Sequence, residues 1–230
     1  MSEPLRLALV GASGLVGRAV IEACLDRRDV RLVAIARREM KLPKGARMEL
    51  FVAEPDKWGE VFEALRPTVL ISALGTTWKK SGSSEEAFRA VDQRLVIATA
   101  RAAQVAGVQR MVAVSSVGAD PLSKNLYLRV KGEVESELSK VGFKRLDLLR
   151  PGLLKGPREA DYRLGERLGV LASPLVDPLL NGKWRRYRSI YAREVAEGAI
   201  GLAMRKAGGR FIHENDAIRR AAREWEKLGG

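Results

Sequence analysis

Tyr127 and Lys131 stand four residues apart in the stretch NLYLRVKGEVESEL, from Asn125 to Leu138. Apolar residues recur there at helical spacing, which predicts an amphipathic helix that begins near Leu126. Residues four apart are neighbours on a helix, so the phenol and the ammonium would lie side by side. A phenol can donate a proton to a substrate, and a nearby ammonium stabilises the phenolate that remains. The pair is therefore a candidate acid–base couple, or else two residues on the flank of an ordinary helix.

Three glycines follow the first apolar segment of the chain. They form G-x-x-G-x-x-G between the strand pattern LRLALV and the helical pattern after it. Glycine permits a tight turn and lets the backbone approach a pyrophosphate, whose charge is stabilised by N–H groups at the helix N-terminus. A plain strand–helix turn is the alternative. We predict that this turn binds a dinucleotide through Gly11, Ala12, Ser13, Gly14, Leu15, Val16 and Gly17.

The residues after the second apolar run select the cofactor. LVAIARRE ends that run with Arg37 and Arg38. An acidic residue at this place would accept hydrogen bonds from the adenosine ribose, whereas arginine accommodates a 2′-phosphate through paired hydrogen bonds. We therefore predict NADP(H) in preference to NAD(H), with a solvated basic turn as the alternative for either arginine.

The composition restricts the chemistry and the location. Cys24 is the only cysteine and His213 the only histidine, which excludes a disulfide framework and a Cys/His zinc site, so we predict no metal. No apolar run is long enough to span a membrane, and the N-terminus MSEPLRLALV lacks the regions of a signal peptide. The sequence predicts a soluble, cytoplasmic protein with no membrane contact.

The net charge of +13 has two readings. A basic chain attracts nucleic acid and anionic cofactors or substrates alike. No nucleic-acid-binding motif is present, and the basic residues form only short groups such as WRRYR at Trp184–Arg188. This pattern argues against specific nucleic-acid binding and for a highly charged, solvated surface.

Strand patterns alternate with helical patterns along the chain. Strands are expected at Leu5–Val10, Val30–Ala36, Met48–Ala53, Thr68–Leu74, Arg110–Ser116 and Arg145–Arg150, and helices at 14–26, 56–65, 84–106, from 126, 193–207 and 216–228. This alternation predicts one α/β domain over residues 1–230, a Rossmann-like doubly wound parallel sheet with helices on both faces. Pro and Gly gather between 153 and 187, which we expect to be a small C-terminal lid or substrate-binding insertion.

Four motifs in this order resemble the short-chain dehydrogenase/reductase superfamily. They are the glycine turn, VSS after the fifth strand, Y-x-x-x-K on the next helix and RPG after the sixth strand. The sequence is most similar to the atypical, Tat-interacting-protein-like NADPH-binding branch, through LGTTWKKSGSSEEAFRAVD, VSSVGAD and LYLRVKGEVE. The resemblance runs from Leu7 to about Ala199.

This resemblance implies a role for each matching residue. Tyr127 would exchange a proton with the substrate oxygen, and Lys131 would activate it and bind the nicotinamide ribose. Ser116 would orient and polarise the carbonyl, with Ser115 as the alternative. Two further cofactor-binding segments would be Leu74, Gly75 and Thr76, near the adenosine, and Pro151, Gly152 and Leu153, near the carboxamide.

Two positions depart from the pattern of the superfamily. Ala53 stands where many members have an Asp that bonds adenine, and Asp92 where many have an Asn that supports a proton relay through water. Cofactor binding is expected to survive both changes, whereas the relay would differ.

Three functions follow from these residues. The first is an NADPH-dependent oxidoreductase that reduces a small carbonyl compound, acting as a monomer or a homodimer. The second is a regulator that senses NADP(H) and binds a protein partner. The third is a nucleotide-sugar epimerase or dehydratase, although residues 151–230 leave little room for a sugar-nucleotide domain. The set of Ser116, Tyr127 and Lys131 favours the first, because a sensor needs no activated phenol.

Overall fold

The computed structural model describes residues 3–46, 48–79, 81–156 and 177–228. Seven parallel strands form the main sheet, in the order β3-β2-β1-β4-β5-β6-β9. Their bounds are β1 Leu5–Val10, β2 Val30–Ala36, β3 Glu49–Val52, β4 Val69–Ser72, β5 Arg110–Val114, β6 Arg145–Arg150 and β9 Gly209–Glu214. The predicted doubly wound parallel sheet is confirmed.

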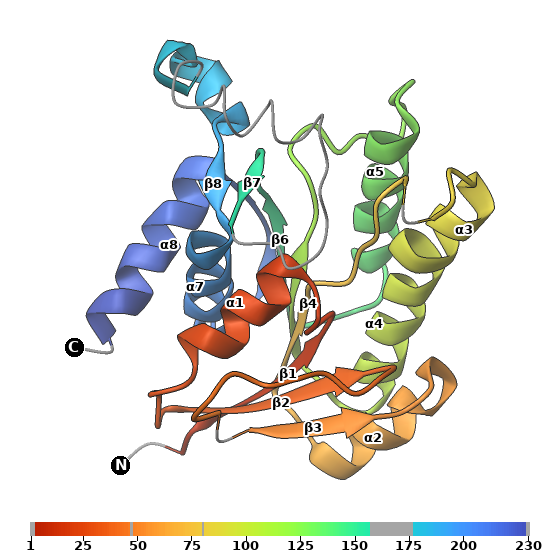
Figure 1. Cartoon of the computed structure of the whole chain (residues 1–230), viewed down its shortest axis with the longest axis vertical. Coiled ribbons are helices and arrows are strands. Elements are labelled where there is room, and N and C mark those ends of the chain that lie inside the picture. The colour runs from red at the N-terminus through yellow and green to blue at the C-terminus, as the bar shows by residue number, and fades with distance from the viewer. Residues whose placement is uncertain (1–2, 47, 80, 157–176, 229–230) are drawn as a thin grey trace.

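Helices cover both faces of the sheet (Figure 1). They are α1 Leu15–Ala23, α2 Trp58–Leu65, α3 Glu85–Arg89, α4 Val96–Val105, α5 Leu126–Leu138, α7 Ala192–Ala203 and α8 Asn215–Leu228. Short helical turns are η1 Pro55–Lys57, η2 Ala90–Leu95, η3 Asp177–Leu179 and η4 Gly182–Tyr187. One core joins the sheet to α1, α7 and α8, and the other joins it to α2, α4 and α5.

The central strands explain why the apolar runs are nearly continuous. β1 pairs with β2 on one side and with β4 on the other. Within β1, Leu7 and Leu9 enter one core while Ala8 and Val10 enter the other. A strand buried on both faces needs apolar residues at successive positions rather than at alternate ones. β4, which is buried at all four residues, follows the same rule.

Two elements differ from the prediction. The expected helix over 84–106 is divided by a π-helical turn, η2, between α3 and α4. The seventh strand, β9, was not predicted, because the side chains from Gly209 to Ile212 are exposed at the sheet edge and form no apolar run. Most other boundaries agree within a few residues, as expected for helix and strand ends.

The predicted insertion over 153–187 is described only in part. It begins with the short strand β7, Leu154–Lys155, which pairs in parallel with β8, Ile190–Tyr191. Asp177 lies near this pair, where one of its carboxylate oxygens accepts a hydrogen bond from the Ser189 N–H at 2.9 Å. Residues 157–176 lie outside the described part of the chain.

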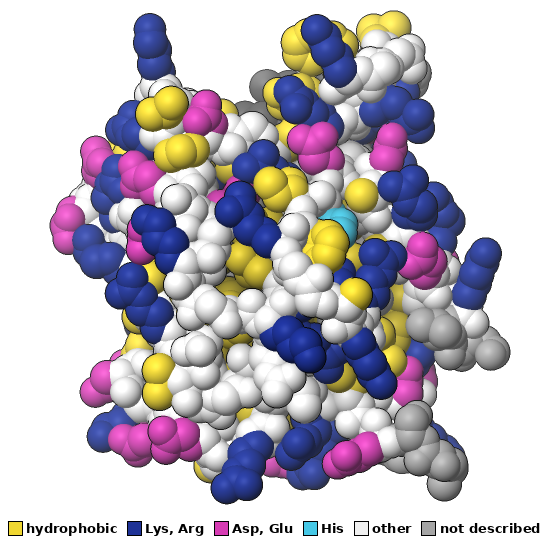
Figure 2. Space-filling model, turned by 180° about the vertical axis from the view of Figure 1, so that it is seen from behind, with side chains coloured by type: hydrophobic (Ala, Val, Ile, Leu, Met, Phe, Trp, Pro, Cys, Tyr) yellow, Lys and Arg dark blue, Asp and Glu magenta, His cyan; other side chains and the backbone are white. Residues whose placement is uncertain are grey.

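Basic side chains do not form a single patch on the face shown in Figure 2. On the side shown in Figure 2, Lys and Arg lie at many separate places, with Asp and Glu among them. Several are paired, as Arg205 is with Glu224 at 2.6 Å. Within the described ranges, no helix is both long and apolar enough to cross a bilayer.

Candidate active site and cofactor cradle

The predicted site segments meet along the carboxyl edge of the sheet. The glycine turn follows β1, the two arginines follow β2, and Leu74–Thr76 lies after β4. Ser116 comes after β5, and Pro151–Leu153 after β6. The order of the strands reverses at β1, since β2 and β4 lie on its two sides. Ligands of doubly wound sheets bind in the crevice outside the carboxyl ends at this reversal.

The three positions of the turn are occupied by glycine for different structural reasons. Gly11 has a φ of +80°, and a Cβ there would lie 2.4 Å from the backbone of Ala73. A Cβ on Gly17 would lie 2.2 Å from the Gly11 carbonyl oxygen, so α1 could not approach β1. At Gly14 the nearest atom to such a Cβ is 3.3 Å away. Protein packing therefore demands Gly11 and Gly17, whereas at Gly14 a Cβ would make a tight contact with the Gly11 carbonyl oxygen without an outright clash.

The N-terminus of α1 can bind an anion. Gly14 is the N-cap, its backbone is extended, and no side chain caps the first N–H groups of the helix. Those N–H groups carry the positive end of the helix dipole and remain available to a ligand. These N–H groups, at a turn without a bulky side chain at Gly14, fit the pyrophosphate of a dinucleotide. The chain after β7 borders this turn, since a Cβ on Gly156 would lie 3.0 Å from Leu15 Cδ1.

Arg37 and Arg38 are both exposed beyond the end of β2. Neither forms a hydrogen bond or an ion pair with any other residue in the described part of the chain. β2 neighbours β1 in the sheet, so both guanidinium groups begin at the strand beside the glycine turn. Their charges are therefore available to a phosphate on the adenosine side of the crevice.

Tyr127 lies in the first turn of α5, which begins at Leu126 as predicted. Asn125 caps this helix, because its side-chain oxygen accepts a hydrogen bond from the Leu128 N–H at 3.2 Å. The Tyr127 side chain is 41% exposed. Its ring lies against the buried ring of Phe88, with centroids 6.0 Å apart, which fixes the phenol without covering it. A phenol held in this way can meet a substrate from solvent.

Lys131 lies one turn further along α5 and is buried. Its Nζ is 5.8 Å from the centroid of the Tyr127 ring and 2.8 Å from Asp92 Oδ1. Burial lowers the pKa of Lys131, but the Asp92 carboxylate, helped by Tyr127 and Glu135, outweighs burial and raises the pKa above its ordinary value. The ammonium is therefore charged at neutral pH, beside the phenol that it would activate.

Asp92 was noted in the sequence only as a departure from Asn, and its pairing with Lys131 was not predicted. The Asp92 side chain is buried, and Oδ2 accepts a hydrogen bond from the Thr76 N–H at 2.6 Å. Asp92 therefore joins the loop after β4 to the lysine on α5. It lies in the π-helical turn η2, a rare conformation that is frequent at functional sites.

We expect Asp92→Asn to reduce the free energy of unfolding by about 2 kcal/mol at pH 7. Removing one partner of a buried pair typically costs about 3–5 kcal/mol, and the amide retains a polar contact that lessens the loss. Lys131 has a raised pKa in the folded protein, so its stabilising contribution is fully present below about pH 10.4, the unfolded value, and is lost as the pH rises through the higher folded-state pKa. Urea unfolding should therefore show a difference between the two proteins that shrinks towards pH 11. A constant difference across this range would contradict an ionic role for Asp92.

The two serines after β5 have different partners. Ser115 Oγ donates a hydrogen bond to Glu135 at 2.5 Å, and Arg150 pairs with the same carboxylate. Among the described residues, the Ser116 hydroxyl forms one hydrogen bond, which it donates to the Val117 carbonyl at 3.3 Å. Ser115 is thus engaged by a buried ion pair, whereas Ser116 can turn its hydroxyl to a substrate. This difference favours Ser116 over the alternative that the sequence left open.

The remaining predicted segments border the same crevice. Gly75 lies beside the ion pair, because a Cβ there would be 3.4 Å from Asp92 Oδ1 and 3.9 Å from Lys131 Nζ. The Val117 N–H donates a hydrogen bond to the Pro151 carbonyl at 3.0 Å, which joins the loops after β5 and β6. The structure thus connects the predicted serine loop to the Pro151–Leu153 turn, and Leu74–Thr76 to Lys131.

A separate cavity lies at the other end of β2, near the C-terminal end of α1. Its volume is about 360 Å³, and Ile21, Cys24, Val30 and Met48 are among its lining residues. Cys24 follows the C-terminal end of α1, and burial raises the pKa of its thiol to about 12. Such a thiol is not nucleophilic at neutral pH.

Residues 11–174 match the NAD(P)H-binding family. Two fungal relatives are the mitochondrial protein FMP52 of Candida albicans and the mitochondrial protein fmp52 of Aspergillus fumigatus. The match to the Candida protein is 31% identical and covers 87% of this chain and 89% of the relative. The match to the Aspergillus protein is 36% identical and covers 84% of this chain and 86% of the relative. These names contradict the predicted cytoplasmic location. That prediction rested on missing secretory and membrane segments, which do not distinguish the cytoplasm from an organelle.

The fold is similar to that of solved enzymes. UDP-glucose 4-epimerase of Thermus thermophilus, solved in complex with NAD, superposes with a TM-score of 0.68 at 20% identity. The match covers 98% of this chain and 84% of the epimerase. The family match, the glycine cradle and the sheet order agree with one another. The chain belongs to the NAD(P)H-binding family, and its fold is that of an atypical short-chain dehydrogenase/reductase.

Proposed function

We propose that the protein is an NADP(H)-dependent oxidoreductase that reduces a small carbonyl compound. One observation carries the proposal: an exposed phenol, Tyr127, lies one helical turn from a buried and charged ammonium, Lys131, beside a cradle that fits a dinucleotide. A nucleotide sensor would need the cradle alone. We further infer a mitochondrial location from the names of the fungal relatives.

Each residue would have a distinct part in the reaction. The glycine turn and the N-terminus of α1 would hold the pyrophosphate, and Arg37 and Arg38 the 2′-phosphate. The bound nicotinamide supplies a hydride. As negative charge develops on the carbonyl oxygen, Tyr127 donates its proton and the Ser116 hydroxyl donates a hydrogen bond to the same atom. Lys131, held by Asp92, stabilises the phenolate that Tyr127 becomes.

The epimerase similarity supports a second candidate function. An epimerase would first oxidise a nucleotide sugar to a ketone with the oxidised cofactor and then reduce that ketone again, so the cofactor would show no net consumption. Two parallel incubations distinguish the two functions: one with NADPH and a panel of aldehydes, ketones and quinones, and one with NAD⁺ or NADP⁺ and UDP-sugars. Stoichiometric loss of NADPH absorbance together with alcohol formation supports the reductase, whereas a changed UDP-sugar without cofactor loss would replace it.

We expect the Arg37→Ala/Arg38→Ala variant to lose its preference for NADPH. The guanidinium groups would pair with the 2′-phosphate, and hydrogen bonds to charged groups are worth about 1.5–3 kcal/mol, or roughly 10- to 100-fold in affinity. NADH carries no such phosphate, so its dissociation constant should change little. Fluorescence titration of both cofactors measures this, with Arg31→Ala, near the start of β2, as a control that removes an exposed arginine. An unchanged NADPH preference in the double variant would refute the assignment.

A further inference from the structure

Two exposed aromatic side chains, one of them the proposed acid Tyr127, contact the same buried ring. Trp78 is 45% exposed and Tyr127 is 41% exposed, whereas Phe88, which both contact, is 1% exposed. The ring centroids are 6.2 Å apart for Trp78 and Phe88, and 6.0 Å apart for Phe88 and Tyr127. We refer to these three residues as the aromatic wall. Trp78 has no catalytic part in the proposed reaction, so the reaction does not explain why this side chain is exposed.

The backbone holds Trp78 in place despite its position in a loop. Its carbonyl oxygen accepts a hydrogen bond from the Ser83 N–H at 2.9 Å and another from Ser81 Oγ at 2.7 Å. Its ring meets Phe88 edge-on, with an interplanar angle of 62°. A side chain fixed in this manner loses little conformational entropy when a ligand binds.

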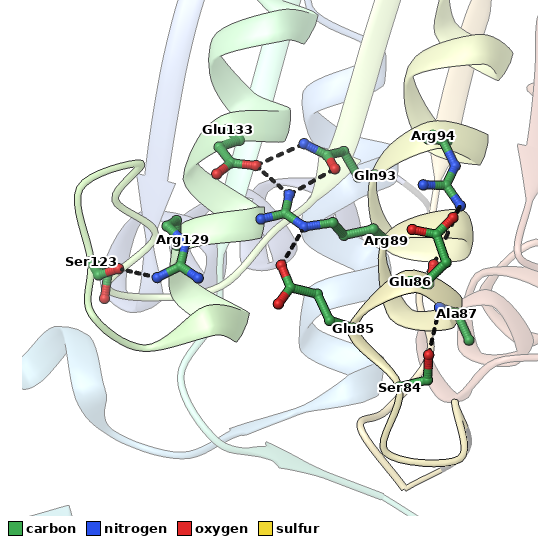
Figure 3. A network of polar contacts seen from close by, with 10 residues as sticks. All are labelled: Ser84, Glu85, Glu86, Ala87, Arg89, Gln93, Arg94, Ser123, Arg129 and Glu133. Carbon is green, nitrogen blue, oxygen red and sulfur yellow. Dashed lines mark hydrogen bonds and ion pairs between the residues drawn. The ribbon is translucent and has the colours of Figure 1, made fainter.

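A polar network holds the two helices of the aromatic wall together (Figure 3). Arg89, next to Phe88 on α3, contacts Glu133 on α5 at 2.6 Å. Gln93 of η2 donates a hydrogen bond to the same carboxylate at 2.8 Å. Ser84 caps α3, since its Oγ accepts a hydrogen bond from the Ala87 N–H at 3.3 Å. Phe88 and Tyr127 therefore keep a fixed relation, although they come from different helices.

A substrate of Tyr127 would lie close to this surface. Its carbonyl oxygen has to reach the Tyr127 hydroxyl, and Tyr127 and Trp78 both contact the single ring of Phe88. An exposed apolar surface beside polar groups is typical of a ligand site. Aromatic pairs contribute about 0.5–1.5 kcal/mol beyond the area that they bury, and this term is available only to a partner that is itself aromatic.

We propose that the aromatic wall is a subsite for a carbonyl conjugated to an aromatic ring, with Trp78 as the residue that recognises the ring. This inference rests on the proposed reductase function only for the position of the carbonyl. Trp78 contacts the substrate and takes no part in proton transfer. It therefore affects binding and selects between substrates of equal reactivity.

Equilibrium binding to the NADP⁺-loaded protein tests the subsite without turnover. The probes are 1-naphthaldehyde and its fully saturated decahydro counterpart, which has the same carbon skeleton, and calorimetry gives both dissociation constants. We expect the wild type to bind the aromatic aldehyde about 10-fold more tightly, as about 1.4 kcal/mol implies. Trp78→Ala should remove this preference, and Trp78→Phe should restore most of it.

Phe211→Ala is the matched control, because it removes an exposed aromatic ring on the edge strand β9. It should keep the full preference, and all variants should keep their affinity for NADP⁺. An equal affinity of the wild type for both probes, or an undiminished preference in Trp78→Ala, would overturn the subsite. Aromatic binding that depends on Trp78, without reduction of either aldehyde by NADPH, would instead leave the subsite standing and reject the reductase function.

Discussion

Replacing Tyr127 with Phe is expected to lower carbonyl reduction about 1,000-fold, within the range typical of losing a general acid. The substitution removes one hydroxyl and leaves the ring that packs on Phe88. The hydroxyl is on an exposed side chain, so folding should persist. Lys131 stays paired with Asp92, so NADPH affinity should also persist. Stopped-flow turnover and NADPH titration, performed on the same preparation, separate the two effects.

Tyr191→Phe provides the control for Tyr127→Phe, since it removes a phenolic hydroxyl from a side chain that is 57% exposed and outside the proposed site. It should retain wild-type turnover. Lys131→Met should lower both turnover and NADPH affinity, because this lysine would contact the ribose and stabilise the phenolate. If Tyr127→Phe reduces a substrate at the wild-type rate, then Tyr127 is not the acid and the mechanism fails.

Replacing Gly14 with Val is expected to weaken NADPH binding at least about 100-fold, equivalent to 2.7 kcal/mol. The backbone of Gly14, with φ −76° and ψ 169°, is open to any residue, so valine causes no backbone strain. Its methyl groups would occupy the space that the pyrophosphate needs against the first N–H groups of α1. The less favourable helix cap should reduce stability by only about 1 kcal/mol.

Gly17→Ala serves as the contrasting variant, because we expect it to impair folding rather than cofactor binding alone. The added methyl would lie 2.2 Å from the Gly11 carbonyl oxygen, so this variant should fail in folding rather than in binding alone. Thermal unfolding and cofactor titration of both variants distinguish the two glycines. A Gly14→Val protein that binds NADPH with wild-type affinity would show that the cradle does not hold the diphosphate.

The local sequence was sufficient to predict those features whose residues lie within one element or one turn. Tyr127 and Lys131 share a helix, and the 3.6-residue period alone brings them together. The glycine turn was recognisable because it lies between an apolar strand and a helix. Six of the seven strands of the main sheet were predicted from apolar runs, since burial on both faces leaves such runs in the sequence. Cofactor preference and residue roles stay predictions until they are measured.

The tertiary structure decided the features that join distant parts of the chain. Asp92 meets Lys131 only because η2 packs beside α5, and the lengthened π-helical turn has no recognisable pattern in the sequence. Likewise, only the fold showed that Glu135 engages Ser115 and leaves Ser116 accessible.

The edge strand β9 and the aromatic wall could not be predicted from the sequence for the same reason. β9 is held by its pairing with β6, more than 60 residues earlier, and its exposed side chains give no apolar period. Trp78, Phe88 and Tyr127 come from a loop and two helices, and nothing in their spacing indicates contact. Local periodicity reflects burial within one element, whereas contacts between elements depend on how the whole chain packs, and that packing alone brought the candidate site together.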